Sequence, residues 1–517
     1  MDATPANATE VSVLIVGAGP TGLILACDLA RRGVTFRIVE KATDYAAGSR
    51  GKGLQPRSLE VLEDFGVINR ILGLGQFHLP HRTYEGTTVL GDHDIHEGRH
   101  PTPDVPYAST MIIPQWRVEE TLRLLLGVRD MRVELATELV AMEQNENFVT
   151  ATLQKHDAQK QVRSKFLVGA DGGHSFVRKS LNVGFEGETW KEERLLTGDV
   201  RVEGLDRDHW HFWPKHKDGF VALCPLLSTE MFQFQAQVLA AEEGKLSLGS
   251  FQRIIDERTG RTDLKLSDPT WLSLYRTNVR MVARYRVGRV FLAGDAAHVH
   301  SPAGAMGMNT GIQDAYNLGW KLDAVLNGAK ESLLDSYEEE RLPIAASLLG
   351  ISTKLHTHTF NDRQFRRGEE VFQLGLNYHS SSLSQQKHSP STLLKAGDRA
   401  PDAPVQDHVG NPVRLFELFR GPRFTLLSLG VHHFPGLNQV NEKFKKILQT
   451  YTIDRGTSGK SACNNQLIDD QGHFHNAYGG DDGLLFLIRP DGYIGYIGAS
   501  KSIGSVDSYL EQFHGKA

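Results

Sequence analysis

The chain has 517 residues, of which 40% are hydrophobic and 23% are charged, and its formal net charge is −5. These values are ordinary for a globular protein of two or three domains, and they leave no basic excess for binding nucleic acid. Neither an apolar run of membrane-spanning length nor a signal peptide is recognisable. The three cysteines (Cys27, Cys224 and Cys463) form no CxxC pair, which is typical of a reduced, cytoplasmic protein.

The N-terminal segment has the pattern of a dinucleotide-binding unit. Residues 11–16 form an apolar, β-branched run that predicts a buried strand, and residues 23–32 predict a helix. Between them stand the glycines of a GxGxxG motif, Gly17, Gly19 and Gly22. A second strand over residues 34–39 ends at Glu40, about 20 residues beyond the glycines, where an acid can bind a ribose hydroxyl. This order predicts a turn around a pyrophosphate.

The most informative segment spans residues 289–322, RVFLAGDAAHVHSPAGAMGMNTGIQDAYNLGWKL. It predicts a buried strand, a turn at Gly294, a loop of small residues and a helix from about Ala305. Asp295, at the end of the strand, is placed to accept from a sugar or ribityl hydroxyl. The helix start presents free N–H groups to an electron-rich ring edge, which would suit reduced flavin. The segment therefore predicts a cradle for a flat cofactor.

A third strand-to-turn junction, KFLVGADGG at residues 165–173, contains Asp171. In their order and spacing, the three segments resemble the three fingerprints of the group A flavoprotein monooxygenases, the enzymes similar to para-hydroxybenzoate hydroxylase. The downstream segment LLDSYEEERLP, residues 333–343, belongs to the same pattern. The resemblance covers roughly residues 10–395.

The resemblance implies an α/β fold with a Rossmann-like FAD-binding domain of the glutathione reductase type and an inserted antiparallel β-sheet substrate domain. A C-terminal thioredoxin-like α/β domain is implied by the aromatic-polyketide and phenol hydroxylases of the family. We expect the FAD-binding domain to take residues 1–80, 108–190 and 276–395, the substrate domain residues 81–107 and 191–275, and the C-terminal domain residues 396–517. Period-2 alternation in residues 208–213, 219–226 and 231–238 independently predicts antiparallel strands.

Several local predictions complete the fold. A helix over residues 344–376 is expected to close the FAD-binding domain, and residues 396–410, AGDRAPDAPVQDHVG, predict a linker. The C-terminal region predicts strands over residues 423–430, 484–490 and 493–498 and helices over residues 441–449 and 506–513. Because the redox CxxC motif is missing, we expect this domain to serve in packing or dimer formation.

The resemblance also implies which residues bind FAD. They are Gly17, Gly19, Gly22, Glu40, Lys41, Arg50, Gln115, Arg117, Leu139, Asp171, Gly294, Asp295, Ala305, Gly307, Met308 and Asn309. Leu139 would meet adenine through its backbone, and residues 305–309 would present backbone N–H groups to the pyrimidine edge. Where many relatives carry glutamine in the loop PAGGQGMN, this chain has Met306, which implies a softer, apolar edge of the pocket.

Candidates for the substrate pocket are Pro302, His211, Trp210, Phe212, Phe234 and Met306. The catalytic group stays unknown, because His209, His211 and Tyr285 are each open as a general base and each also has an ordinary structural interpretation. Paired histidines occur at several places, but no pair has further ligands at regular spacing, so no metal site is expected.

The implied activity is that of an FAD-dependent, NAD(P)H-consuming monooxygenase. It would hydroxylate a phenolic, polyketide or antibiotic-like aromatic molecule with O2 through a flavin hydroperoxide. NADPH or NADH would bind transiently, because no second GxGxxG follows another strand. Two alternatives stay open: a flavin dehydrogenase or oxidase without oxygen insertion, and an FAD-containing protein that sequesters a planar ligand. Neither nucleic acid nor membrane is an expected partner, the location is expected to be cytoplasmic, and a homodimer is one open oligomeric state.

Overall fold

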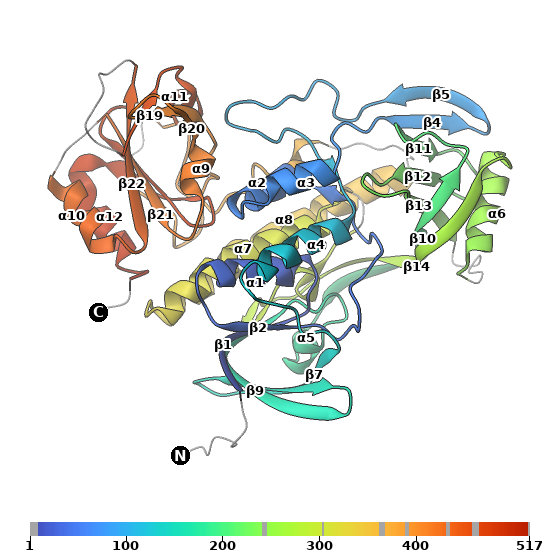
Figure 1. Ribbon diagram of the computed structural model, residues 1–517, viewed down its shortest axis with the longest axis horizontal. Coiled ribbons are helices and arrows are strands. Elements are labelled where there is room, and N and C mark those ends of the chain that lie inside the picture. Colours follow the sequence, from blue (N-terminus) through green and yellow to red (C-terminus); the bar gives the residue numbers. More distant parts are fainter. Residues whose placement is uncertain are drawn as a thin grey trace.

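The structure is a computed structural model that describes residues 9–239, 246–301, 304–360, 368–387, 392–430, 435–456 and 465–514. Within these residues, three large sheets define three units (Figure 1). The C-terminal unit lies at the left of the view and an antiparallel sheet at the right, with the unit that contains the N-terminal strand below and between them. This arrangement confirms the predicted α/β fold.

The first unit is built on a mixed sheet whose parallel strands run in the order β16–β9–β1–β2. Its strands are β1 (Thr9–Val16), β2 (Phe36–Val39), β7 (Thr137–Gln144), β8 (Val149–Lys155), β9 (Ala158–Gly169), β15 (Arg286–Val287) and β16 (Val290–Leu292). β1 reads as a nearly continuous apolar run because both faces of a parallel sheet are covered, and Val13, Leu14 and Ile15 are fully buried.

α1 (Pro20–Arg31) packs on β1 and β2, and α5 (Phe176–Ser180) packs on β7 and β9. The other helices of this unit are α2 (Pro56–Asp64), α3 (Ile68–Leu74), α4 (Gln115–Gly127), α7 (Gly307–Leu326) and α8 (Asp335–Phe360). A short ladder pairs β3 (Gly53–Leu54) with β6 (Met111–Ile112). α1 and α7 pack so closely that position 311 requires glycine: a Cβ there would lie 2.3 Å from Thr21 Oγ1.

The helix predicted over residues 344–376 begins earlier than expected. α8 starts at Asp335 and continues through Pro343, which lies inside the helix. The helix ends at Phe360 within the described residues, and residues 369–372 form a separate 3-10 turn. The prediction was therefore wrong at both ends.

The antiparallel sheet, which includes one parallel pair, β11 with β4, has the strand order β17–β14–β10–β13–β12–β11–β4–β5. The strands are β4 (His81–Glu85), β5 (Thr88–His93), β10 (Glu186–Glu203), β11 (Trp210–Trp213), β12 (Val221–Pro225), β13 (Phe232–Leu239), β14 (Lys265–Met281) and β17 (His298–Val299). β10 begins at Glu186 and β14 ends at Met281, so both strands extend past the expected domain boundaries at residues 191 and 275. The unpredicted helix α6 (Leu248–Thr259) covers one face of the sheet, where Phe251 stacks on Phe234.

The C-terminal unit is a mixed sheet with the order β18–β25–β24–β21–β22–β23–β19–β20. Its elements are β18 (Gln385–Gln386), β19 (Pro404–Asp407), β20 (Pro412–Arg414), α9 (Leu415–Phe419), β21 (Phe424–Leu429), α10 (Pro435–Phe444), β22 (Leu448–Arg455), β23 (Gln466–Asp469), α11 (His473–Tyr478), β24 (Leu484–Ile488), β25 (Ile494–Ala499) and α12 (Ile503–Leu510).

Two predictions in this unit were wrong. The expected linker at residues 396–410 is a packed part of the sheet: it contains β19, and Asp402, which is fully buried, accepts a hydrogen bond from Phe416 N at 3.0 Å. The expected helix over residues 441–449 instead ends at Phe444 and gives way to β22. Prolines and aspartates suggested a solvated connection in the first case, whereas the carboxylate of Asp402 is buried and accepts hydrogen bonds from Arg414 and Phe416.

A buried charge cluster joins the C-terminal unit to α7 and α8. Arg489 binds Glu340 through both terminal nitrogens, at 2.6 and 2.9 Å, and also contacts Asp491 at 2.5 Å. Lys321 Nζ lies 2.7 Å from Glu340 Oε2, and Trp320 Nε1 donates to Asp491 Oδ2 at 3.0 Å. These five side chains are almost completely buried, so the C-terminal unit is an integral part of the fold.

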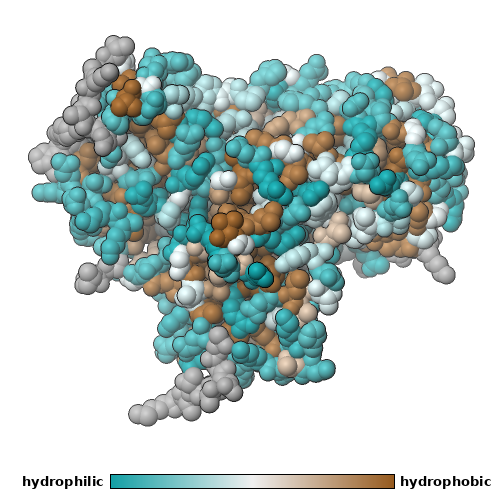
Figure 2. All heavy atoms as spheres, viewed as in Figure 1, coloured by the Kyte–Doolittle hydropathy of each residue, from teal (hydrophilic) through white to brown (hydrophobic). Residues whose placement is uncertain are grey.

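On the face shown in Figure 2, apolar residues form scattered groups among hydrophilic ones. Among the described residues, no helix combines the length and apolarity needed to cross a lipid bilayer.

Candidate active site

The GxGxxG turn has one open side. Gly17 has φ +103°, and a Cβ there would lie 2.3 Å from the carbonyl oxygen of Ala170. A Cβ on Gly22 would lie 2.0 Å from the carbonyl oxygen of Gly17. At Gly19, the residue before α1, nothing lies within 4 Å of such an atom. Gly17 and Gly22 therefore allow close backbone packing, and Gly19 leaves room for a pyrophosphate at the helix start.

Glu40 lies against this turn. Its carboxylate accepts hydrogen bonds from Ala18 N and Ala42 N, both at 3.0 Å. The backbone of Thr137 donates to Glu40 O at 2.9 Å, which brings the chain leading to Leu139 beside it. The side chain of Leu139 is buried, so a ligand could meet this residue through its backbone, and Lys41 is exposed nearby.

Asp171 is engaged in the protein itself. Its carboxylate accepts from Ser175 Oγ at 2.6 Å and from Phe176 N at 2.7 Å, at the start of α5. Its Cα would lie 2.9 Å from a Cβ on Gly17. The backbone of Asp171 therefore packs directly against Gly17 of the glycine turn.

The third fingerprint forms a turn and a helix start that face a common space. Gly294, with φ +59°, begins the 3-10 turn Gly294–Ala296, and Asp295 lines a cavity. Surrounding protein raises the pKa of the Asp295 carboxyl above its ordinary value, although the side chain is accessible from the cavity. Ala305 has φ +52°, and Gly307 and Met308 begin α7 on the same cavity wall.

A buried network, which the sequence did not predict, holds this turn to α7. Asp314 accepts from Gly294 N at 3.0 Å and from Arg341 Nε at 2.8 Å, and it lies 2.7 Å from His298 Nε2. Burial alone would raise the pKa of Asp314, but the charges of His298 and Arg341 lower it to about 2. His298 Nδ1 lies 3.0 Å from His300, whose pKa burial lowers to about 3. Asp314 therefore stays ionised while His300 stays neutral.

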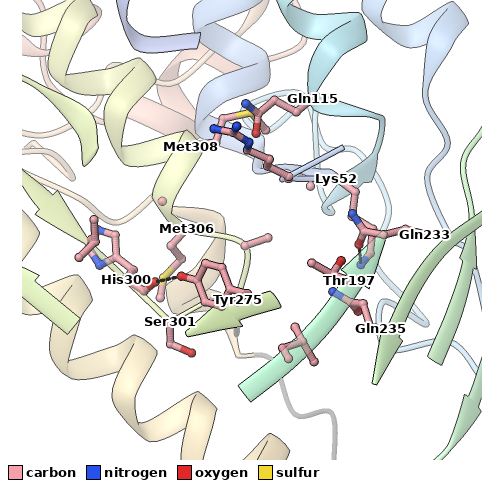
Figure 3. Close-up of a pocket in the computed structure, with 18 of the residues that line it drawn as sticks. Lys52, Gln115, Thr197, Gln233, Gln235, Tyr275, His300, Ser301, Met306 and Met308 are labelled. Atoms are coloured by element: carbon pink, nitrogen blue, oxygen red, sulfur yellow. Dashed lines mark hydrogen bonds between the residues drawn. The ribbon is translucent and has the colours of Figure 1, made fainter. Parts of the chain in front are cut away.

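The cavity has a volume of about 540 Å³ and lies between the start of α7 and the antiparallel sheet (Figure 3). This volume lies in the usual range for small-molecule sites. Its sheet wall is rich in hydrogen-bonding side chains, with aromatic and aliphatic side chains beside them. The wall consists of Leu195, Thr197, Trp210, Phe220, Gln233, Gln235, Trp271, Ser273, Tyr275 and Asn278.

The predicted pocket residues divide between the two faces of the sheet. Trp210 lines the cavity, but His211 and Phe234 point to the other face, where His211 Nδ1 contacts Tyr84 OH at 2.7 Å and Phe234 packs on α6. Phe212 packs in an apolar cluster with the cavity-lining Trp210 and Phe220 but does not itself line the cavity. For His211 and Phe234 the pocket prediction was wrong because alternation predicts two faces without showing which one faces the cavity. Pro302 lies outside the described residues.

Met306 contributes to the cavity wall, but its side chain has no exposed surface and packs among Ile344, Leu348 and Leu355. It therefore does not form the soft pocket edge that was expected. Asn309 is also buried: its amide binds Gln55 N at 2.8 Å and Gly53 O at 2.9 Å, which ties β3 to α7.

Arg50 and Gln115 line the cavity, and Gln115 donates to Glu119 at 2.9 Å. Arg117 does not reach it: the guanidinium contacts Glu120 at 3.0 Å and Ser228 O at 2.9 Å. The structure thus gives no support to a cofactor contact by Arg117.

The general-base candidates also lie away from the cavity. Tyr285 is fully buried against Tyr337. His209 contacts Asp206 at 2.7 Å and Arg82 at 3.0 Å, and neither Tyr285 nor His209 lines the cavity. Among the described residues, no cluster of three or more histidine, cysteine or carboxylate side chains could hold a metal ion.

Sequence reasoning missed a polar cluster that joins the loop before β3 to the sheet. Asp199 on β10 accepts from Ser49 N at 2.7 Å, and Gln233 on β13 donates to Ser49 O and accepts from Lys52 Nζ. Burial raises the pKa of Asp199 to about 6. The signal available in the sequence was the glutamine repeat in MFQFQAQV, a period-2 polar face.

Asp199 should contribute a pH dependence to stability. Its folded-state pKa lies above the unfolded value, so the folded state binds the extra proton, and stability should fall as pH rises from about 4 to about 6. Asp199→Asn should remove this contribution. We expect the melting temperature of the variant, relative to the native protein, to increase over that interval; parallel curves at every pH would contradict the assignment.

The comparisons with known proteins agree with this geometry. The family model of the FAD-binding domain matches residues 10–352, and that of the aromatic-ring hydroxylase C-terminal domain matches residues 394–517. A flavin-dependent monooxygenase of Mycobacteroides abscessus is 42% identical over 94% of this chain and 96% of its own. Pentachlorophenol 4-monooxygenase of Sphingobium chlorophenolicum is 31% identical over 95% and 94%. The structure of anhydrotetracycline hydroxylase from Streptomyces rimosus has a TM-score of 0.78 at 26% identity and covers 98% of this chain and 100% of its own.

The fold, the cavity and the similarity to known proteins together define this protein as an FAD-binding oxidoreductase. The open side of the glycine turn, the carboxylate of Glu40 and the shared cavity at Asp295 and α7 fit FAD. The chain belongs to the FAD-dependent aromatic-ring hydroxylases, and it is a flavin-dependent monooxygenase of that family.

Proposed function

We propose that the protein uses NAD(P)H and O2 to hydroxylate a phenolic or polycyclic aromatic molecule in the cavity between α7 and the antiparallel sheet. The observation that carries this proposal is the cavity itself, which brings Asp295 and the start of α7 together with the polar wall of β10, β13 and β14. A relative that is 31% identical is named for pentachlorophenol, which supports a phenolic substrate. FAD, when bound, would accept electrons from NAD(P)H and supply the reduced ring that activates oxygen.

The residues of the chain would divide this work by position. The turn at Gly17 and the acid Glu40 would hold the adenosine diphosphate part, and Asp295 would accept from the ribityl chain. Backbone N–H groups at Gly307 and Met308 would face the pyrimidine edge with the positive end of α7. Trp210 and Trp271, as flat apolar walls, would exclude water from the substrate ring.

Anaerobic stopped-flow reduction of the flavoprotein by NADPH tests this function against a ligand-sequestering protein. With a panel of phenols, polyketide aromatics, tetracyclines and rifamycins, we expect one class to accelerate flavin bleaching by orders of magnitude. NADH in the same experiment gives the coenzyme preference. Flavin that neither coenzyme reduces with any compound would contradict the proposal.

We further propose a cytoplasmic location, and size-exclusion chromatography of the holoenzyme tests for a homodimer.

A further inference from the structure

Among the described residues that line the cavity, one, Lys52, carries an ammonium group, and it lies on the side of the sheet. Lys52 lies in the segment Gly51–Gly53, and its neighbours face the opposite direction: a Cβ on Gly53 would lie 2.9 Å from Ala305 Cβ, and one on Gly51 would lie 3.9 Å from Met308 Cε. Because side chains alternate along an extended segment, Lys52 points away from α7 and towards β11 and β13. Figure 3 shows its side chain directed to Gln233.

The position of this ammonium is well defined. Lys52 Nζ donates to Gln233 Oε1, and it lies 4.3 Å from the centre of the Trp210 ring. The amide of Gln233 is oriented in turn, because its nitrogen donates to Ser49 O. Lys52, Gln233 and Trp210 are each more than nine-tenths buried, and all three line the cavity. A cation held in a low-dielectric wall interacts strongly with an anion in the cavity.

Neutral hydrogen-bonding groups extend this wall across the sheet. The strand register places Gln235, Thr197 and Ser273 side by side on β13, β10 and β14. Neighbouring strands lie about 4.8 Å apart, so these side chains present polar groups at that interval along one row. A ring system with oxygen atoms along one edge could form a hydrogen bond with each of these three side chains. The ammonium of Lys52 would lie beside them.

We propose that Lys52 binds the ionised hydroxyl oxygen of the aromatic substrate and so determines specificity for phenolates. This inference rests on the proposed hydroxylation, and it adds the residue that selects the reactive ionised form. On binding, the phenol O–H bond breaks heterolytically: the electron pair stays on oxygen beside Lys52 and the proton passes to bulk water. The retained electron pair enriches the ring for attack by an electrophilic oxygen.

Other charged and titratable groups line or adjoin the same cavity. Asp199 on β10 does not line it but accepts a hydrogen bond from Ser49 N and interacts with Lys52. Arg50 lies on the same loop as Lys52, and Tyr275 on β14 keeps its proton because burial raises its pKa. Asp295, His300 and His174 lie on the wall next to α7 and β9. The negative charge of Asp295 would oppose ionisation of a phenol, so a lowered substrate pKa requires a cation on the other wall.

The test is a spectrophotometric pH titration of a bound nitrophenol on the oxidised holoenzyme. We use 4-nitrophenol and 4-nitro-1-naphthol, whose phenol and phenolate forms absorb at different wavelengths. The native protein should lower the pKa of the bound probe by about one unit, which is about tenfold in the ratio of phenolate to phenol. Lys52→Met should abolish the shift, and Lys52→Arg should retain most of it.

Lys443→Met, which removes an exposed lysine paired with Asp507 and Glu511, is the matched control and should leave the probe titration unchanged. FAD content measured in each variant shows whether it has folded. An unshifted probe on the native protein, failure of both probes to bind, or a shift that survives in Lys52→Met would overturn the inference. Hydroxylation of a substrate by the native protein would stand in each of those cases, so failure of this inference is separable from failure of the proposed function.

Discussion

Arg489→Met is expected to lower the free energy of unfolding by about 3–5 kcal/mol, the usual cost of removing one partner from a buried ion pair. Arg489 donates hydrogen bonds to both carboxylate oxygens of Glu340 and to both of Asp491. The side chains of these three residues are each at most 1% exposed to solvent. Methionine fills similar volume but leaves two buried carboxylates with one cation, Lys321, whose pKa burial lowers to about 8. Urea denaturation of the native and variant holoenzymes measures the loss.

Arg82→Met is the matched control, because Arg82 pairs with Asp92 and Asp206 at the accessible edge of the antiparallel sheet. Such a pair contributes about 0–1 kcal/mol. Adding Glu340→Gln to Arg489→Met should recover part of the loss, since it neutralises one orphaned carboxylate. Equal stability of Arg489→Met and Arg82→Met would contradict the structural role of the cluster.

Asp295→Ala is expected to weaken FAD binding by about 10- to 150-fold, the equivalent of one hydrogen bond to a charged group, at about 1.5–3 kcal/mol. The carboxylate lies at the turn before α7, and its Oδ1 would be 4.0 Å from a Cβ on Gly307. A ribityl hydroxyl there would lose its acceptor. Fluorescence titration of the apoprotein with FAD gives the dissociation constant.

Asp335→Ala, at the exposed start of α8, removes a carboxylate of the same unit and should leave FAD affinity unchanged. Melting temperatures of both apoproteins separate a local loss of binding from a loss of folding. Asp295→Ala protein that is purified with full flavin occupancy would refute the assigned contact.

The dinucleotide-binding unit could be predicted because its physics is local. A β-branched run, three spaced glycines and an acid at the end of the next strand each restrict the backbone within a few residues. The same holds for the strand and helix on either side of Asp295. In these segments the structure differs from the prediction by a few residues at the ends of elements.

The partners of these segments were not predictable, because long-range packing decides them. Asp314 reads as an ordinary helical residue, yet it holds Gly294, His298 and Arg341 from another part of the chain. The stretch around Asp402 reads as a linker, although burial against Arg414 and Phe416 makes it part of a sheet. In both cases polar residues suggested solvent, whereas the fold supplies buried partners.

In the cavity wall, the alternation of side chains along the strands predicted two faces but not which of them lines the cavity. In β13 the pocket candidate was Phe234, but it packs with Phe232 on the face away from the cavity, while Gln233 and Gln235 line the cavity. Both faces of this sheet are covered, one by α6 and one by the cofactor-binding unit. The polar face of β13 lines the cavity because α6 covers the other face, and the sequence alone does not give the position of α6.

Oxygen insertion is tested most directly by the mass of the product formed under ¹⁸O₂ with NAD(P)H and the compound that best accelerates flavin reduction. We expect one ¹⁸O atom in each hydroxylated product molecule and no label when only H₂¹⁸O carries the isotope. A product oxidised without label from ¹⁸O₂ would contradict oxygen insertion and indicate a flavin dehydrogenase or oxidase.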